Sequence, residues 1–146
     1  MYLGAQMKHY RVDDQLLNAA IKQAQERFPQ DWSGAAAMYT ETGRILTSVY
    51  VDAPNAAACL CHETGAICEA HRLNERICAS VCVSREQDNE PYVILTPCGI
   101  CQERLAYWGL DVEVAVPDKT NPTTFQSLQL RHVQPHYWHQ VYGDEA

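Results

Sequence analysis

The chain has 146 residues and a mass of 16.5 kDa, a size that predicts a single domain over residues 1–146. Hydrophobic residues make up 47% and charged residues 20% of the sequence, values that exclude a disordered or fibrous chain. The net charge of -7, with no run of basic residues, argues against nucleic acid as a partner. No apolar stretch approaches the roughly 20 residues that span a bilayer, and the start of the sequence lacks the pattern of a signal peptide. We therefore expect a cytoplasmic protein that does not bind a membrane.

Hydrophobic periodicity predicts a helix, a pair of strands and a second helix in the first half of the chain. Residues 13–27 place apolar side chains at helical spacing, behind two aspartates that can cap the helix. The segments 33–39 and 44–51 are strand-like, and the turn between them contains Gly43, so we expect an antiparallel hairpin. Helix-forming residues then extend over 62–76.

The second half of the chain continues the alternation of strands and helices. A buried strand at 77–84 and a short strand at 91–95 precede a helix expected over 98–109. A strand at 111–116 and a short helix at 124–130 follow. This order indicates an α/β fold in which a mixed sheet carries helices on both faces.

The seven cysteines are the unusual part of the composition. An odd number of cysteines without an export signal fits reduced thiols better than disulfides. Cys98 and Cys101 form a C-x-x-C directly after Pro97, where a strand meets the start of a helix and thiolate charge is favoured. This arrangement predicts two ligands of a zinc ion. A redox dithiol is the alternative, although in a thioredoxin-like protein it would follow the first strands.

Two segments compete to supply the third ligand and a nearby carboxylate. The first is Cys61 with Glu63, which opens the helix expected at 62–76. The second is Cys68 with Glu69, which leaves only about two turns of helix before the next strand. The longer helix that follows Cys61 can cross the sheet, so spacing favours Cys61 and Glu63.

Two stretches of sequence, VYVDAPNAAACLCHE and TPCGICQERL, resemble the zinc-dependent cytidine deaminase family. The pattern is most similar to its small tetrameric branch, which includes blasticidin S deaminase. The resemblance implies a three-layer α-β-α sandwich with a mixed five-stranded sheet and a homotetramer. It also implies Cys61, Cys98 and Cys101 as ligands of Zn²⁺ and Glu63 as the catalytic proton shuttle. The expected reaction replaces the amine of a cytosine-type base, in a nucleoside or a nucleoside analogue, with a carbonyl and releases ammonia.

The sequence departs from this family at the positions expected to bind substrate. Nucleoside deaminases carry an Asn-x-Glu that holds the ribose hydroxyls, and the matching positions here are Tyr50 and Asp52. Aspartate can still accept a hydrogen bond from a hydroxyl, whereas tyrosine cannot replace an amide. We therefore expect a nucleoside analogue, a modified cytosine or a blasticidin-like compound as substrate, with Asn55 as a substitute contact.

The positive charge near the metal is also arranged differently. Family members often carry arginine directly after C-A-E or after the second cysteine of the clamp, where this chain has Thr64 and Gln102. Arg72 and Arg104 are the candidates to offset the charge of three thiolates.

Other interpretations remain open for the whole protein and for several residues. The chain could be a catalytically silent deaminase-like zinc protein that binds a nucleoside-like ligand, or a nucleic-acid editing enzyme, which its acidic charge disfavours. His62 should point away from the metal, and Glu69 should be a charge on a helix surface. We expect core packing for four cysteines, Cys59, Cys68, Cys78 and Cys82. The tail residues His132, His136, Tyr137, Trp138 and His139 are read as a packing or subunit-contact segment rather than a metal patch, and Phe125, Tyr137 and Trp138 as candidates to stack on a base.

Overall fold

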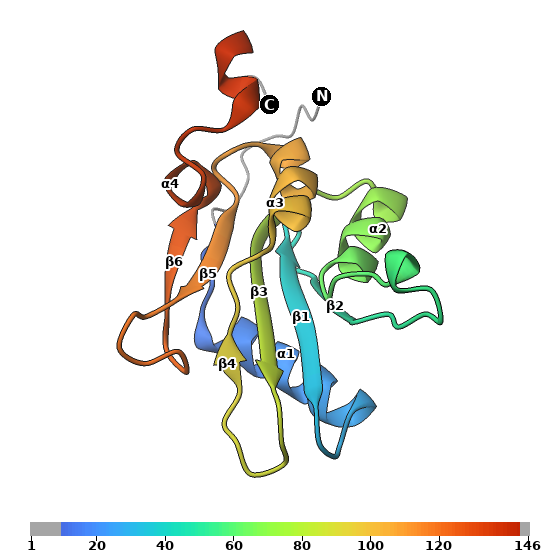
Figure 1. Cartoon of the computed structure of the whole chain (residues 1–146). Helices are drawn as coiled ribbons and strands as arrows, with labels where there is room; N and C mark the ends of the chain where they lie inside the picture. Colours follow the sequence, from blue (N-terminus) through green and yellow to red (C-terminus); the bar gives the residue numbers. More distant parts are fainter. Residues whose placement is uncertain (1–9, 144–146) are drawn as a thin grey trace.

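The structure of the protein, a computed structural model, describes residues 10–143. Its centre is a six-stranded mixed sheet in which the strands lie in the order β2-β1-β3-β5-β6, while β4 pairs with β3 beside that path. Helix α1 covers one face of the sheet, and α2 and α3 cover the other (Figure 1). The predicted α/β fold class, a layered arrangement with helices on both faces, is confirmed.

The first face is formed by helix α1 (Asp14–Arg27) on strand β1 (Ser33–Thr40). Asp13 caps the helix, since its side chain accepts a hydrogen bond from the backbone N–H of Leu16. The buried stripe of the helix is small apart from Leu16, with alanines at the next two inward positions. Small side chains let the helix lie close to a strand that is buried along its whole length.

The second face holds the start of two helices that bring the cysteines together. Strand β2 (Ile45–Val49) pairs antiparallel with β1 through the turn at Gly43, whose φ is 83° as expected for a hairpin glycine. The chain then forms the short 3-10 helix η1 (Ala56–Ala58) and helix α2 (Thr64–Leu73). Helix α2 begins two residues later than expected, so Glu63 occupies its N-cap position.

The remaining strands and helices close the sheet. Strand β3 (Ile77–Arg85) pairs antiparallel with β1 and with the two-residue strand β4 (Val93–Ile94). Helix α3 (Gly99–Leu105) continues into η2 (Ala106–Trp108) and leads to β5 (Glu113–Pro117), which runs parallel to β3. The chain then adds three elements, β6 (Phe125–Gln129), α4 (Leu130–Val133) and η3 (Trp138–Tyr142).

The helix expected at 124–130 is wrong, because β6 lies there and the sheet has one more strand than expected. β6 pairs antiparallel with β5 along its whole length. Its backbone N–H and C=O groups therefore form hydrogen bonds with β5 instead of within a helical turn. Ser127 in the middle of β6 is buried, where its hydroxyl accepts a hydrogen bond from the backbone N–H of Val12. Tertiary pairing therefore overrides the local helical preference.

Within residues 10–143, no helix combines the length and the apolar character needed to cross a membrane.

Candidate functional site

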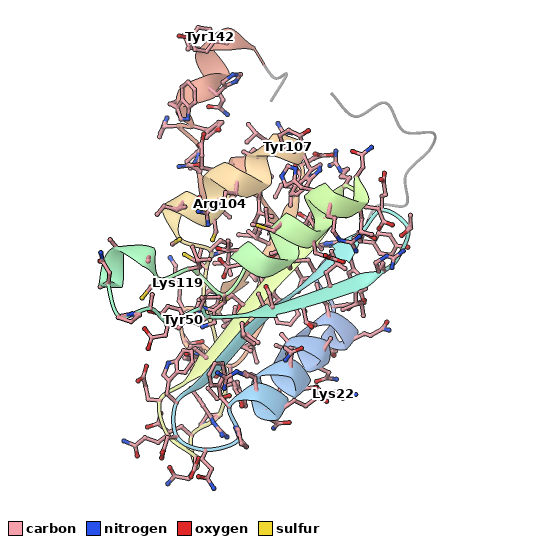
Figure 2. The ribbon with its side chains drawn as sticks, turned by 90° about the vertical axis from the view of Figure 1, so that its right-hand side faces the viewer. Lys22, Tyr50, Arg104, Tyr107, Lys119 and Tyr142 are labelled. Carbon is pink, nitrogen blue, oxygen red and sulfur yellow. The ribbon has the colours of Figure 1, made fainter. Side chains whose placement is uncertain are left out.

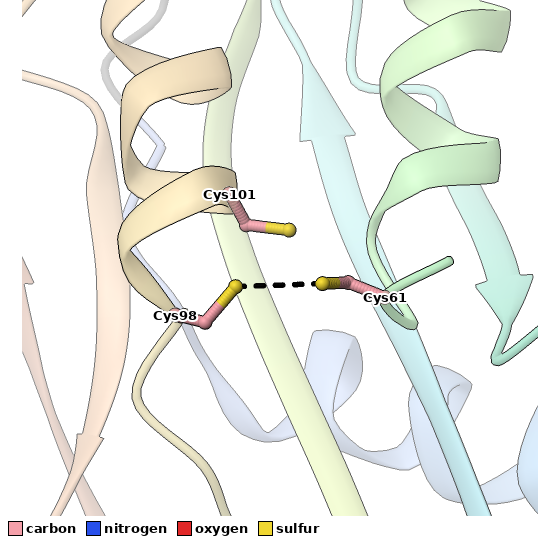
Figure 3. A group of neighbouring side chains, drawn as sticks. All are labelled: Cys61, Cys98 and Cys101. Carbon is pink, nitrogen blue, oxygen red and sulfur yellow. Dashed lines mark hydrogen bonds between the residues drawn. The ribbon is translucent and has the colours of Figure 1, made fainter. Parts of the chain in front are cut away.

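Three cysteines from two separate segments meet at the start of α2 and α3. Cys61 lies in the turn before α2, Cys98 is the N-cap residue of α3, and Cys101 lies in its first turn. Their sulfur atoms lie within 4.8 Å of one another, and the Sγ atoms of Cys61 and Cys98 are 3.4 Å apart. The three side chains point toward a common centre (Figure 3).

The position of each thiol in the fold controls its pKa. Burial alone would raise the pKa of Cys98, but hydrogen bonds from the backbone N–H of Cys101 and from the Cys61 thiol outweigh it and lower that pKa. Burial, followed by the hydrogen bond with Cys98, raises the pKa of Cys61. Burial and the negative charge of Glu63 raise the pKa of Cys101. The cluster therefore lacks the positive charge that would hold all three sulfurs as thiolates.

The donor set fits a divalent zinc ion. Zn–S bonds of about 2.3 Å in a tetrahedron place sulfur atoms roughly 3.8 Å apart, close to the spacing found here. A cation at the centre would also supply the missing positive charge. Among the described residues, these three cysteines form one of two groups of side chains close enough to hold a metal ion.

Glu63 brings a carboxylate to the cysteine cluster. Its side chain is only 3% exposed, and it lies against Cys101 and Cys82 closely enough to raise the pKa of both thiols. For Cys82, burial in the middle of β3 is the larger cause. A buried carboxylate beside a group of thiols is costly unless a cation or a proton compensates it.

A pocket of about 310 Å³ opens beside these groups. Within residues 10–143, its lining contains no lysine or arginine, which disfavours a phosphorylated ligand. The wall contains the Glu63 carboxyl, four thiols, two ring side chains and three other side chains, from Tyr50, Cys59, Leu60, Cys61, His62, Glu63, Cys82, Leu95, Thr96 and Cys98.

The three residues expected to bind substrate lie at different distances from this pocket. Tyr50 lines it, and hydrogen bonding with Cys59, followed by burial, raises the pKa of Tyr50 to about 12. Asp52 is exposed and accepts a hydrogen bond of 3.4 Å from the Cys59 thiol. Asn55 is exposed and caps η1, because its Oδ1 accepts a hydrogen bond from the backbone N–H of Ala57. Of the three, Tyr50 is thus the one placed in the pocket wall.

Two residues of the pocket were expected to have no role in it. Cys82 is buried, as predicted for a core residue, but its thiol also forms part of the pocket wall beside Glu63. His62 lies outside the group of three cysteines, yet it lines the pocket and one of its ring nitrogens lies within 4.8 Å of both Glu63 and Cys82. Burial lowers the pKa of His62, although the charge of Glu63 opposes this effect. The sequence signal for both was their position, next to a ligand for His62 and on a buried strand for Cys82.

The structure separates the two arginines considered as sources of positive charge. Arg104 on α3 (Figure 2) donates a hydrogen bond of 2.9 Å from Nη1 to Oγ1 of Thr64, the residue directly after Glu63. Arg72 donates instead to the Glu69 carboxylate, with N–O distances of 3.0 and 2.6 Å, on the exposed side of α2. Of the two, Arg104 is the cation near the first turn of α2.

The alternative pair, Cys68 and Glu69, lies on α2 away from the three-cysteine cluster. Cys68 is exposed on α2, so its expected core packing is wrong, and Glu69 is a surface charge paired with Arg72 as expected. Cys78 is buried as expected, whereas Cys59 is only half-buried and lines the pocket.

The C-terminal tail combines one buried aromatic residue with several exposed ones. Tyr137 belongs to the core beneath α2 and α3, whereas Trp138 is largely exposed and donates from Nε1 to the Glu103 carboxylate. The histidines of the tail do not form a metal-binding group in the described part of the chain.

Comparison with known proteins finds structures similar to this fold. No protein-family model matches the sequence, and no curated protein matches it. The structure is similar to the crystal structure of the cytidine deaminase from Bacillus anthracis, with 42% sequence identity, a TM-score of 0.83, and coverage of 90% of this chain and 93% of that chain. A mutant cytidine deaminase from Mycobacterium tuberculosis shares 23% identity over 87% of this chain and 95% of its own, with a TM-score of 0.68. The cytidine deaminase from Mycobacterium leprae shares 23% identity over 84% and 97%, with a TM-score of 0.63.

The two mycobacterial matches support the fold, a mixed sheet with helices on both faces. The Bacillus anthracis match has a higher identity and covers most of both chains, and it therefore shows that the chain belongs to the cytidine deaminase family.

Proposed function

We propose that this protein is a zinc-dependent hydrolase that deaminates a cytosine-type base carried by a nucleoside or a nucleoside analogue. The observation that carries the proposal is the buried carboxylate of Glu63 beside three clustered cysteines, two of which, Cys61 and Cys98, line the same pocket as Glu63. Membership of the cytidine deaminase family supports the reaction class.

In this proposal Cys61, Cys98 and Cys101 would hold the zinc ion, and three protein ligands are the number typical of a catalytic zinc site. Zinc held in this way lowers the pKa of water, so that a nucleophile is available near neutral pH. The N–H groups at the start of α3 and the guanidinium near Thr64 offset part of the negative charge of the three thiolates.

Glu63 moves the protons of the reaction. Its carboxylate accepts a proton from the attacking water and delivers it to ring nitrogen N3, while the oxygen bonds to C4, the carbon that carries the amine. The carboxylate then accepts the remaining proton of that oxygen and delivers it to the amine, which leaves as ammonia while C4 becomes a carbonyl carbon. Burial of Glu63 keeps bulk water from competing for these protons.

The lining of the pocket favours an unphosphorylated substrate whose sugar-like group differs from the ribose of cytidine. No lysine or arginine of the described part of the chain lines it, and a tyrosine stands where a ribose-binding amide was expected. We propose that Tyr50 forms the wall on this side, that Asp52 accepts a hydrogen bond at the mouth, and that Asn55 holds the loop through η1. A blasticidin-like compound or a modified cytosine nucleoside is the substrate class we favour.

We also propose a homotetramer in a reducing compartment, the cytoplasm. Several large apolar side chains of α3, η2 and η3 are exposed, with Val141 at 80%, and η3 extends beyond α4 away from the body of the molecule (Figure 1). Exposed apolar patches of this kind mark protein contacts. All seven cysteines are free, which supports a reducing compartment. Light scattering on the purified protein measures the number of chains.

The test is ammonia release from cytidine, deoxycytidine, cytosine, blasticidin S and modified cytosine nucleosides by zinc-loaded protein. We expect Glu63→Gln to lower turnover at least about 100-fold, because the proton shuttle is lost while the shape of the pocket is kept. Glu69→Gln is the matched control, since Glu69 lies on the same helix but pairs with Arg72 at the surface, and it should keep full activity.

Two results would contradict the proposal. Turnover that survives Glu63→Gln would exclude Glu63 as the proton shuttle. No turnover of any substrate by protein shown to contain zinc would favour the catalytically silent, ligand-binding alternative.

A further inference from the structure

We propose that His62, Glu63 and Cys82 form a second metal site, for a borderline-soft divalent cation such as Zn²⁺ or Cd²⁺, and that its occupation inhibits the enzyme. The existence of the site rests on the geometry of these three residues alone. The inhibition rests in addition on the proposed role of Glu63 in catalysis.

The three side chains place a nitrogen, a carboxylate oxygen and a sulfur around one point. These atoms lie within 4.8 Å of one another, and the group shares no residue with the three-cysteine cluster. Ligand atoms around a tetrahedral zinc lie roughly 3.3–3.8 Å apart. Side-chain rotations that move each ligand atom by about an ångström would therefore bring the three atoms to the distances that an ion requires. All three residues line the pocket, so an ion can reach them from solvent.

The chemistry of the donors matches a cation of this class. One carboxylate and one thiolate balance the charge of a divalent ion, and imidazole is the commonest neutral ligand of zinc. Together the two sites would place two divalent ions among four thiolates and one carboxylate, so the pocket would carry no excess positive charge. Among the residues that the structure describes, no lysine or arginine lines the pocket to repel a second ion.

The surroundings of His62 hold its ring in place and leave its Nε2 atom without a hydrogen-bond partner among the described residues. The ring lies between Trp32 and Tyr50, with ring centroids at 5.6 and 5.9 Å. Gly34 makes room for it, because a Cβ there would lie 2.4 Å from His62 Nε2. In the described part of the chain Nε2 is a buried polar atom with no hydrogen-bond partner. A fixed imidazole with unused hydrogen-bonding capacity beside a carboxylate and a thiol is what a metal ligand requires.

Occupation of this site would remove the proton shuttle from the reaction. A Glu63 carboxylate bound to a cation cannot accept a proton at the rate that catalysis needs, and an ion beside it would occupy space in the substrate pocket. Enzyme loaded with one zinc ion should therefore be active, and enzyme carrying a second ion should be inhibited.

The experiment is equilibrium dialysis of the full chain, loaded with one equivalent of zinc, against rising concentrations of Zn²⁺, with bound metal measured by atomic emission. We expect the wild type to bind a second ion. His62→Phe keeps a ring between Trp32 and Tyr50 but removes the donor, and Cys82→Ala removes the thiol. Each variant should lower the affinity for the second ion at least about tenfold. Tenfold is the low end of the loss of affinity when even an outer-shell partner of a metal is removed.

Matched controls come from exposed residues of α2. His71→Phe and Cys68→Ala remove an imidazole and a thiol of the same helix that lie outside both groups, and both should keep the second ion at wild-type affinity. Retention of the first ion shows that a variant is folded. If Cys82→Ala does not fold, Gly34→Ala replaces it, because the added methyl displaces the ring of His62 while every donor stays present.

The proposal is overturned if the wild type binds one ion throughout the titration, or if the second ion binds equally well to His62→Phe and to Cys82→Ala or its replacement. Turnover measured on the same samples should fall in proportion to occupation of the second site, and full turnover with the second site filled would overturn the inhibition. If no substrate is turned over at all, the proposed function fails, while the dialysis still decides whether the site exists.

Discussion

At the scale of single residues, Tyr50 forms part of the pocket wall. Hydrogen bonding with Cys59, followed by burial, raises the pKa of Tyr50 to about 12, and the phenol is neutral over the physiological range. The ring packs against Trp32 and His62, with centroids 5.8 and 5.9 Å away. Tyr50 is therefore a fixed wall with one hydroxyl, and it lacks the paired donor and acceptor that an amide offers to a sugar.

This arrangement predicts the effect of restoring an amide at this position. We expect Tyr50→Asn to raise kcat/KM for cytidine about two- to tenfold relative to 1-methylcytosine, the effect of one added hydrogen bond to the ribose. Tyr50→Phe, which removes the hydroxyl and keeps the ring, is the control and should not raise this ratio. An equal rise in both variants would mean that loss of the hydroxyl, rather than the amide, causes the change.

At the scale of elements, a tyrosine fastens the first helix to the sheet. The hydroxyl of Tyr39 on β1 donates to Asp13, the N-cap residue of α1, with distances of 2.8 and 3.1 Å to its two carboxylate oxygens. Burial, followed by this hydrogen bond, raises the pKa of Tyr39 to about 12. The contact joins residues that are distant in sequence and so depends on the complete fold.

We expect Tyr39→Phe to lower the free energy of unfolding by about 1.5–3 kcal/mol near pH 7, the value of a hydrogen bond to a charged group. The folded pKa is raised, so the contribution is complete below the unfolded pKa of about 10 and is lost as pH rises from about 10 toward 12. Urea denaturation at pH 7, 10 and 11 should show the difference between wild type and variant narrowing at the two higher values. Tyr10→Phe serves as the control, and a Tyr39→Phe difference that stays constant up to pH 11 would contradict this role.

The same scale shows what the sequence could predict. Helix α1 and strands β1 and β3 follow the expected segments, because long runs with a clear period are decided by local pattern. Strand β6 was missed, because its pairing with β5 depends on a partner that its own five residues do not reveal. For the site, the spacing of Cys61, Cys98 and Cys101 predicted a cluster that the structure does assemble. The sequence could not place Cys82 or His62 in the pocket, because their positions there depend on where β3 lies relative to the start of α2.

At the scale of the whole molecule, the cysteine cluster joins two segments that no strand pairing connects. Cys61 is held in the turn before α2, and Cys98 and Cys101 are held at the start of α3. The two helices share few contacts of their own, although Arg104 and Thr64 bridge them once. A metal ion shared by the three sulfurs would therefore connect the start of α2 to the start of α3, in addition to any part it takes in the reaction.

This role predicts that removal of the metal destabilises the fold as well as stopping turnover. A ligand that binds only the folded state contributes about 2.7 kcal/mol when its free concentration is about 100 times its dissociation constant. For a chain of this size such a loss lowers Tm by roughly 5–10 °C. Calorimetry of protein with one equivalent of zinc, before and after treatment with a strong chelator, measures the shift. Cys98→Ala should already have the lower Tm and should not respond to the chelator, whereas Cys68→Ala should respond as the wild type does. A chelator-induced shift of full size in Cys98→Ala would place the stabilising metal elsewhere in the molecule.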